Sequence, residues 1–380
     1  SGVCRVIRSR KCCIGIVHFG QMTTESKKTA VLDICDSHFH CWDLEARANP
    51  NLGDMRTKLP LYDPAMYIKD MSSAFMLRLR SAVHVEATVG QKKGGAVIDP
   101  VAETAWLSSA LDKVELPHAL VAYTNLSCIR DDADKVMAAH TAFSGTRGVR
   151  MILNYHDSNA NLIWPQVEQD FLSVSDSFRR GYGLLAKHNL SFDLQCNPHQ
   201  LTQAAAFLAE YGSTPVVLNH MGLPYLGHGN SDSVFVGADE AELKTWRTGC
   251  VVCDVMPPGM QALSKVHHVA VKFSMLSFCL EGWERVNERT ELMRSLVHET
   301  VSLFGAERCM FGSNYPVDKM SGVDLATLYS TFQSFVTDYS LEAQRGMFHD
   351  NAARFYRIQE TDTPSEDCAS TQSEPGKAST

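Results

Sequence analysis

The sequence lacks long apolar runs and has little positive charge. No stretch approaches the roughly 20 apolar residues of a membrane-spanning helix. Lys and Arg number 35 against 43 Asp and Glu, for a net charge of -8, and basic residues are dense only at the N-terminus. Nucleic acids and anionic membranes require a basic surface. We therefore expect a small-molecule partner, no nucleic acid and no membrane, and a homo-oligomer is left open.

A disulfide framework is lacking as well. The 12 cysteines are spread along a chain of 380 residues, whereas disulfide scaffolds are typical of small secreted domains. Cys250 and Cys253 form a lone C-x-x-C motif that no second pair completes into a zinc site. We predict free thiols in a reducing compartment, and hence an intracellular, cytoplasmic protein.

The composition indicates one large domain with loose ends. Hydrophobic residues make up 44% and charged residues 21%, which is ordinary for a globular chain with a large core. Residues 1–30 are rich in Arg and poor in acids, as in a flexible leader or a mitochondrial targeting segment. Residues 357–380 are rich in Ser, Thr, Pro and acids, so we expect a disordered tail. The domain then spans residues 31–356.

Short apolar, β-branched runs alternate with helical patterns across that domain, which indicates repeated βα units. Eight such runs predict a closed (β/α)8 TIM-type barrel. An open doubly wound sheet is the alternative, but no G-x-G-x-x-G motif follows any strand. Helices are predicted over residues 99–113 and 287–305. The strands are predicted over residues 30–40, 81–87, 118–126, 146–153, 190–197, 215–220, 269–275 and 308–314.

The active site of such a barrel lies at the carboxyl ends of its strands. The first predicted strand ends in Asp36-Ser37-His38-Phe39-His40. Because side chains alternate along a strand, His38 and His40 point the same way and could share one metal ion or one anionic group.

Several stretches resemble the amidohydrolase superfamily, in its lactonase-like branch with sugar-acid lactonases and 2-pyrone-4,6-dicarboxylate lactonase. They include "DSHFHCWD", "VVLNHMGLP" and "RCMFGSNYPVD", and they run in order over about residues 33 to 356. The resemblance implies that His38 and His40 bind metal or substrate and that His220 faces the site. It also implies that Arg150 holds a substrate oxygen through its planar fork. Lys272 is a further candidate for substrate binding, with a structural role almost equally expected.

Two residues depart from the family pattern. Many members bridge two metals through a modified lysine on the fourth strand, where this sequence has arginine, so we expect one metal at most. The family usually ends the eighth strand with aspartate, whereas Asn314 carries an amide that cannot accept a proton at neutral pH.

Glu86 is the candidate to replace that carboxylate, as ligand, base or both. If Val83 and Val85 pack against the helices, His84 and Glu86 point into the barrel. The alternative is that Glu86 only pairs with a barrel arginine. Asp193 and Asn197, on one face of the fifth predicted strand, are candidates for binding substrate hydroxyls.

We therefore predict a hydrolase that acts on a small oxygenated lactone or a related carboxylate-bearing compound. One divalent metal, zinc by its preference for imidazole, would activate water at His38 and His40. Metal-free catalysis with Glu86 as the base stays open. The alternatives are an amidohydrolase-type decarboxylase and a non-catalytic binding protein, which Asn314 favours.

Overall fold

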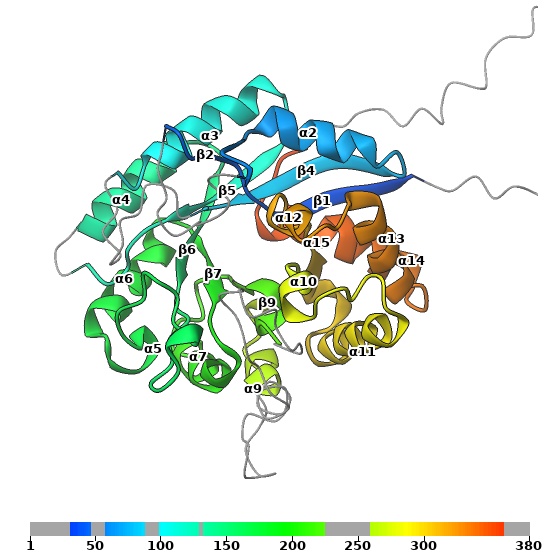
Figure 1. Ribbon diagram of the computed structural model, residues 1–380. Helices are drawn as coiled ribbons and strands as arrows, with labels where there is room; N and C mark the ends of the chain where they lie inside the picture. Colours follow the sequence, from blue (N-terminus) through cyan, green and yellow to red (C-terminus); the bar gives the residue numbers. More distant parts are fainter. Residues whose placement is uncertain (1–30, 47–57, 88–98, 129–131, 225–258, 361–380) are drawn as a thin grey trace, which may run out of the picture. The chain divides into compact units, whose positions relative to one another are not determined.

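A computed structural model describes residues 31–46, 58–87, 99–128, 132–224 and 259–360, and it contains the predicted barrel (Figure 1). Eight parallel strands pair in the order β1-β4-β5-β6-β7-β8-β9-β10. All eight predicted runs are strands: β1 Leu32–Phe39, β4 Leu77–Val85, β5 His118–Tyr123, β6 Thr146–Ile152, β7 Ser191–Gln195, β8 Val216–Leu218, β9 Val269–Phe273 and β10 Cys309–Phe311. A small antiparallel pair, β2 Trp42–Asp43 and β3 Leu61–Tyr62, follows the first strand.

The barrel closes between the first and last strands. Phe39 bridges Tyr315, the backbone N–H of Asn314 donates to the carbonyl of His38 at 2.7 Å, and that of His40 donates to Tyr315 at 2.7 Å. Gly312 makes this approach possible, because an added Cβ would lie 2.8 Å from the Cβ of His38 and 2.9 Å from its backbone nitrogen. The closure therefore fixes the backbone on which three predicted site residues lie, His38, His40 and Asn314.

The helices lie outside the sheet (Figure 1). Both predicted helices are present: α3 follows Asp99, whose side chain accepts from the N–H groups of Val101 and Ala102 at 3.0 and 3.2 Å, and α11 stops at Gly305, whose φ is 83°. The helices are α2 Pro64–Ser73, α3 Ala102–Lys113, α4 Asp132–Thr141, α5 Phe171–Val174, α6 Asp176–Lys187, α7 Leu201–Leu208, α9 Gly259–Ser264, α10 Leu276–Cys279, α11 Asn287–Phe304, α12 Val317–Met320, α13 Leu325–Phe335, α14 Leu341–Arg345 and α15 Asn351–Phe355.

The interior of the barrel is partly apolar, which corrects one prediction. Val83 and Val85 pack with small apolar side chains of five other strands and with Tyr356, which follows α15. Side chains from so many strands can meet only inside the barrel, so the valines face inward. The expectation that they pack against the helices was wrong, because a barrel interior is itself filled with apolar side chains.

Other predictions are tested only in part. None of the helices in the described residues is long and apolar enough to cross a membrane. The cysteines that the structure describes are free thiols, as predicted: Cys35, Cys41, Cys128, Cys196, Cys279 and Cys309. Residues 1–30, residues 361–380 and the Cys250–Cys253 motif lie outside the described residues.

Candidate functional site

Three imidazoles meet at the carboxyl ends of β1 and β8. The ring of His38 lies 4.9 Å from that of His40 and 4.7 Å from that of His220, between centroids. Burial lowers the pKa of each imidazole, and nearby positive charges lower it further, from Lys272 at His38 and from Arg150 at His40 and His220. All three are therefore neutral at pH 7 and offer a nitrogen lone pair.

His38 and His40 differ in their partners. Nδ1 of His40 donates to the carbonyl of Val85 at 2.7 Å, and its Nε2 lies 3.2 Å from Oδ1 of Asn314. Both ring nitrogens of His38 are buried, and neither has a hydrogen-bond partner. A buried polar atom without a partner is costly, so His38 is arranged for a group other than the side chains around it.

Asn314 lies directly beside these imidazoles. Its φ of 53° is in the left-handed region, which asparagine tolerates better than most residues. Its Nδ2 donates to Oδ2 of Asp318 at 2.7 Å. The carboxylate missing at position 314 is thus supplied one helical turn later, behind the amide.

Asp318 was not predicted as a site residue. It lies in the short helix α12, and it is only 1% exposed. Burial raises the pKa of this carboxyl to about 6, although hydrogen bonds from Asn314 and Ser277 oppose the rise. The signal in the sequence was an acid four residues after Asn314.

His220 enters the site from an unusual turn. His220, Met221 and Leu223 have φ values of 57°, 52° and 55°, and Gly222 between them has 72°. A left-handed residue other than glycine costs roughly 1–2 kcal/mol. Nδ1 of His220 lies 2.9 Å from Oγ of Ser274, after β9, which fixes the ring. The strained turn and this hydroxyl together hold the imidazole beside His38.

Arg150 and Glu86 form a buried ion pair. Nε of Arg150 donates to Oε1 of Glu86 at 2.7 Å, one terminal nitrogen donates to Oε1 of Gln195 at 3.1 Å, and the other donates to the carbonyl of Glu86. The exposed fractions of the Arg150 and Glu86 side chains are 5% and 1%. Pairing with a barrel arginine was the alternative role for Glu86, and the structure shows it. A role as the base stays a prediction.

Lys272 and Asp193 are paired within the barrel. Nζ of Lys272 donates to Oδ2 of Asp193 at 2.7 Å, and both side chains are fully buried. The hydroxyl of Tyr356 lies 2.9 Å from both Asp193 oxygens, and the Tyr356 ring lies 4.9 Å from Nζ of Lys272. These contacts give both residues a structural role, and their contact with substrate stays a prediction.

Asn197 is also engaged by the protein. Its Oδ1 accepts from Asn154 at 2.7 Å, and its Nδ2 donates to the carbonyls of Leu162 and Tyr155 at 2.7 and 3.1 Å. Three hydrogen bonds tie together the segments that follow β6 and β7. The structure therefore shows Asn197 holding loops, and its predicted contact with a substrate hydroxyl is not tested.

Asp36 supports the first strand from below. It accepts from the N–H of Ser313 at 2.8 Å, from the hydroxyl of Tyr67 at 2.8 Å and from the N–H of His38 at 3.2 Å. Its carboxylate thus joins β1, the segment after β10 and helix α2. Asp36 was found in the motif of the first strand, and no role was predicted for it from the sequence.

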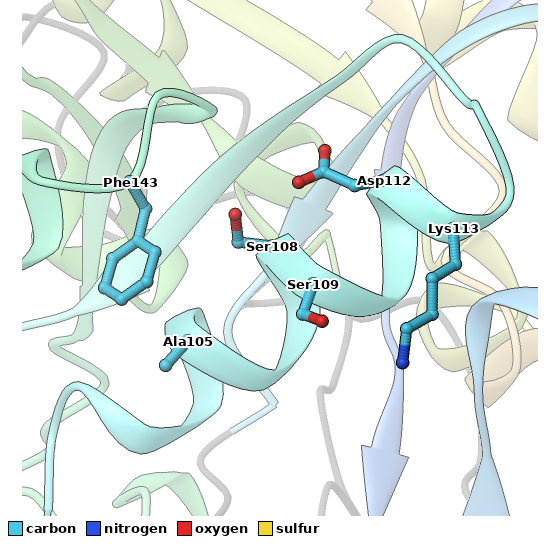
Figure 2. A pocket seen from close by; sticks show the side chains of 6 residues that line it. All are labelled: Ala105, Ser108, Ser109, Asp112, Lys113 and Phe143. Atoms are coloured by element: carbon cyan, nitrogen blue, oxygen red, sulfur yellow. The ribbon is translucent and has the colours of Figure 1, made fainter.

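A separate hollow of about 450 Å³ lies along α3 (Figure 2). Its lining is Ala105, Ser108, Ser109, Asp112, Lys113 and Phe143, and none of these is a candidate site residue. This lining contains two hydroxyls and two charged side chains of α3, but no histidine and no arginine. We therefore place the functional site at the strand ends.

Three side chains at the strand ends offer atoms of the kind that bind a divalent metal ion. Among the residues that the structure describes, no three His, Cys, Asp or Glu side chains form a group that could hold an ion. His38 and His40 offer neutral imidazoles, however, and Asn314 turns an amide oxygen toward His40. Imidazole ligands whose second nitrogen donates to a carbonyl are typical of zinc sites. Two imidazoles and one amide oxygen are the donor set of this chain.

Two bacterial proteins are similar to this chain in sequence. The uncharacterized protein y4mH of Sinorhizobium fredii is 30% identical over 332 residues, 86% of this chain and 98% of that protein. An L-fucono-1,5-lactonase of Burkholderia multivorans is 26% identical over 204 residues, 51% of this chain and 61% of that enzyme.

Two solved structures share the fold. An amidohydrolase from Burkholderia multivorans with bound zinc has a TM-score of 0.63 at 22% identity, over 87% of this chain and all of that one. A putative 2-pyrone-4,6-dicarboxylic acid hydrolase from Pseudomonas putida has a TM-score of 0.57 at 19% identity, over 86% of this chain and 98% of that one. A sequence model of the amidohydrolase family matches residues 35–358. The chain therefore belongs to the amidohydrolase family.

Proposed function

We propose that the protein hydrolyses a small oxygenated lactone that carries a carboxylate. The observation that carries the proposal is the fixed guanidinium of Arg150 beside three neutral imidazoles at the strand ends. A guanidinium binds carboxylate and stabilises an oxyanion, and neutral imidazoles can hold a metal or transfer a proton. The lactonase and the pyrone-dicarboxylate hydrolase among the similar proteins support a cyclic ester as the substrate.

Arg150 would bind the substrate oxygens. Glu86 and Gln195 accept from three of its five N–H groups, and the other two would donate to the substrate. A preorganised donor costs no reorganisation when negative charge develops on the carbonyl oxygen. His220, held by Ser274, would stabilise the same oxygen through Nε2.

His38, His40 and Asn314 would hold one divalent ion, with zinc favoured by the imidazoles. A bound zinc ion lowers the pKa of water and so supplies a nucleophile at neutral pH. Glu86 is the proton acceptor we propose for a metal-free route. Its carboxylate lies 2.7 Å from Nε of Arg150, next to the group that we propose binds the substrate oxygens.

A panel of sugar-acid and pyrone-carboxylate lactones, with product analysis, tests the proposal. We expect a ring-opened acid as the product and at least a 100-fold loss of kcat/KM in Arg150→Lys, because lysine cannot reproduce the fork. Released carbon dioxide would instead identify a decarboxylase.

Saturable binding without turnover would identify a non-catalytic binding protein. Asn314 favours this hypothesis because its amide cannot accept a proton at neutral pH. Asn314→Asp separates the two cases. If the substitution creates activity from nothing, the chain is a lapsed enzyme. If it lowers an existing activity, asparagine is part of the mechanism.

A further inference from the structure

We infer that Asp318 is a positioning residue, which turns the Asn314 amide so that an acceptor oxygen, and not an NH2 group, faces His40. The inference rests on the proposed metal site of His38, His40 and Asn314. Asp318 itself touches none of the proposed ligand atoms except through Asn314, whose Nδ2 donates to it at 2.7 Å.

The orientation of the amide follows from the chemistry of its neighbour. An ionised carboxylate can only accept hydrogen bonds, so the end of Asn314 that faces Asp318 must be its NH2 group. Oδ1 is then forced to the opposite side, where it lies 3.2 Å from Nε2 of His40. The neighbouring Lys319 does not compete for this carboxylate, because its Nζ donates to Asp70 at 2.7 and 2.8 Å.

The tautomer of His40 follows in the same way. The carbonyl of Val85 can only accept, so Nδ1 of His40 carries the proton that it donates there at 2.7 Å. In a neutral imidazole, Nε2 is then a lone pair. Nε2 of His40 and Oδ1 of Asn314 are therefore two acceptors that face each other with no hydrogen between them.

Nε2 of His40 and Oδ1 of Asn314 repel each other unless a cation or a hydrogen-bond donor lies close to both atoms. His38, whose ring is 4.9 Å away, adds a third buried acceptor nitrogen with no partner. A cation bound between these three acceptor atoms would remove their repulsion. Asp318 contributes to this arrangement because it holds the NH2 group of Asn314 away from His40. An amide at position 318 would remove this arrangement, because Asn314 could then rotate and donate Nδ2–H to His40.

Metal affinity tests the inference on the full-length chain. Co²⁺ and Zn²⁺ binding would be titrated at pH 8 for the wild type and for Asp318→Asn, Asn314→Ala and the double variant. We expect one ion per wild-type chain and a loss of affinity of about 10–100-fold in Asp318→Asn, the range for residues that orient ligands. In the Asn314→Ala background, Asp318→Asn should have no further effect.

Lys319→Met is the matched control, since it changes the next residue of α12 and should leave the affinity unchanged. If the Asp318→Asn protein does not fold, the wild type can still test the inference. The ¹⁵N NMR signals of its imidazoles, recorded without metal and assigned with His40→Gln, show which ring nitrogen of His40 carries the proton. We expect an unprotonated Nε2 in His40.

Three results would overturn the inference: no metal bound by the wild type, unchanged affinity or additive losses in the cycle, or a protonated Nε2 in metal-free His40. Failure of the proposed function is distinct, because it appears as a lack of lactone turnover by the wild type while the affinities behave as expected.

Discussion

Nε of Arg150, in β6, donates to Oε1 of Glu86, which follows β4, at 2.7 Å, with both side chains almost completely buried. Removing one partner of a buried ion pair costs about 3–5 kcal/mol, whereas replacing both partners by apolar residues is often neutral. Variants of this pair can therefore distinguish a loss of activity from a loss of stability.

Glu86→Gln should abolish turnover and lower the free energy of unfolding by about 3 kcal/mol, because the guanidinium stays buried without its counter-ion. Urea denaturation and lactone turnover measure the two effects. The control is Glu86→Leu with Arg150→Met, which should regain stability and stay inactive. Turnover retained in Glu86→Gln would rule out Glu86 as the base.

Tyr356→Phe should lower the free energy of unfolding by about 1.5–3 kcal/mol, the value of a hydrogen bond to a charged group, and leave KM unchanged. The hydroxyl lies 2.9 Å from both oxygens of Asp193, which in turn pairs with Lys272. Thermal unfolding and steady-state kinetics would be compared. A raised KM with unchanged stability would favour a role of Asp193 and Lys272 in substrate binding.

Gly312→Ala should destabilise the barrel by about 1–3 kcal/mol, the usual cost of overpacking, and weaken activity. The added Cβ would press on His38 and on the hydroxyl of Ser37 at 2.8 Å, and so push β10 away from β1. Gly212→Ala is the matched control, since nothing lies within 4 Å of its Cβ. Equal stability of the two variants would contradict the close approach.

His349 should make stability depend on pH. Burial alone lowers the pKa of His349, but hydrogen bonds to Glu360 and Asp350 outweigh it and raise the pKa above the ordinary value of 6.5. Nε2 of His349 lies 3.0 Å from both Glu360 oxygens, and Nδ1 lies 2.7 Å from Asp350. Burial raises the pKa of Glu360, but hydrogen bonds from His349 and Ser81 and the nearby charge of Arg80 outweigh this effect and lower the pKa.

The folded protein thus holds the His349 proton more tightly than the unfolded chain. This contribution to stability is complete below pH 6.5 and is lost as pH rises through the folded pKa. The contribution of Glu360 is present above pH 4.5 and lost below it. Melting temperatures between pH 5 and 9 should fall on the alkaline side, and His349→Gln should flatten that fall. An identical slope in the variant would contradict the role of this imidazole.

The sequence was most informative where the pattern is local. Short apolar, β-branched runs between helical patterns predicted all eight strands, and capping at Asp99 and the glycine at 305 predicted two helix ends. The motif around His38 and His40 predicted a site at the end of β1, where the structure places three imidazoles together.

The rest depended on contacts that no local pattern encodes. Alternation along β4 separates Val83 from His84 but does not say which of them faces inward, since both faces of a barrel strand are buried. The partners of Glu86 and Asp193 lie 64 and 163 residues away, at Arg150 and Tyr356. Asp318 could be recognised only once the turn after β10 had brought it behind Asn314.

The position of Tyr356 along the chain has a consequence for synthesis. The tyrosine that covers Asp193 and Lys272 lies beyond the last strand, so a ribosome completes all eight strands of the barrel and both of these charged residues before their cover exists. Until Tyr315 emerges, the edge of β1 lacks its last partner, and until Tyr356 emerges the ion pair of Lys272 and Asp193 lacks its cover. A growing chain of this protein is thus exposed to edge-to-edge association for nearly the whole of its translation.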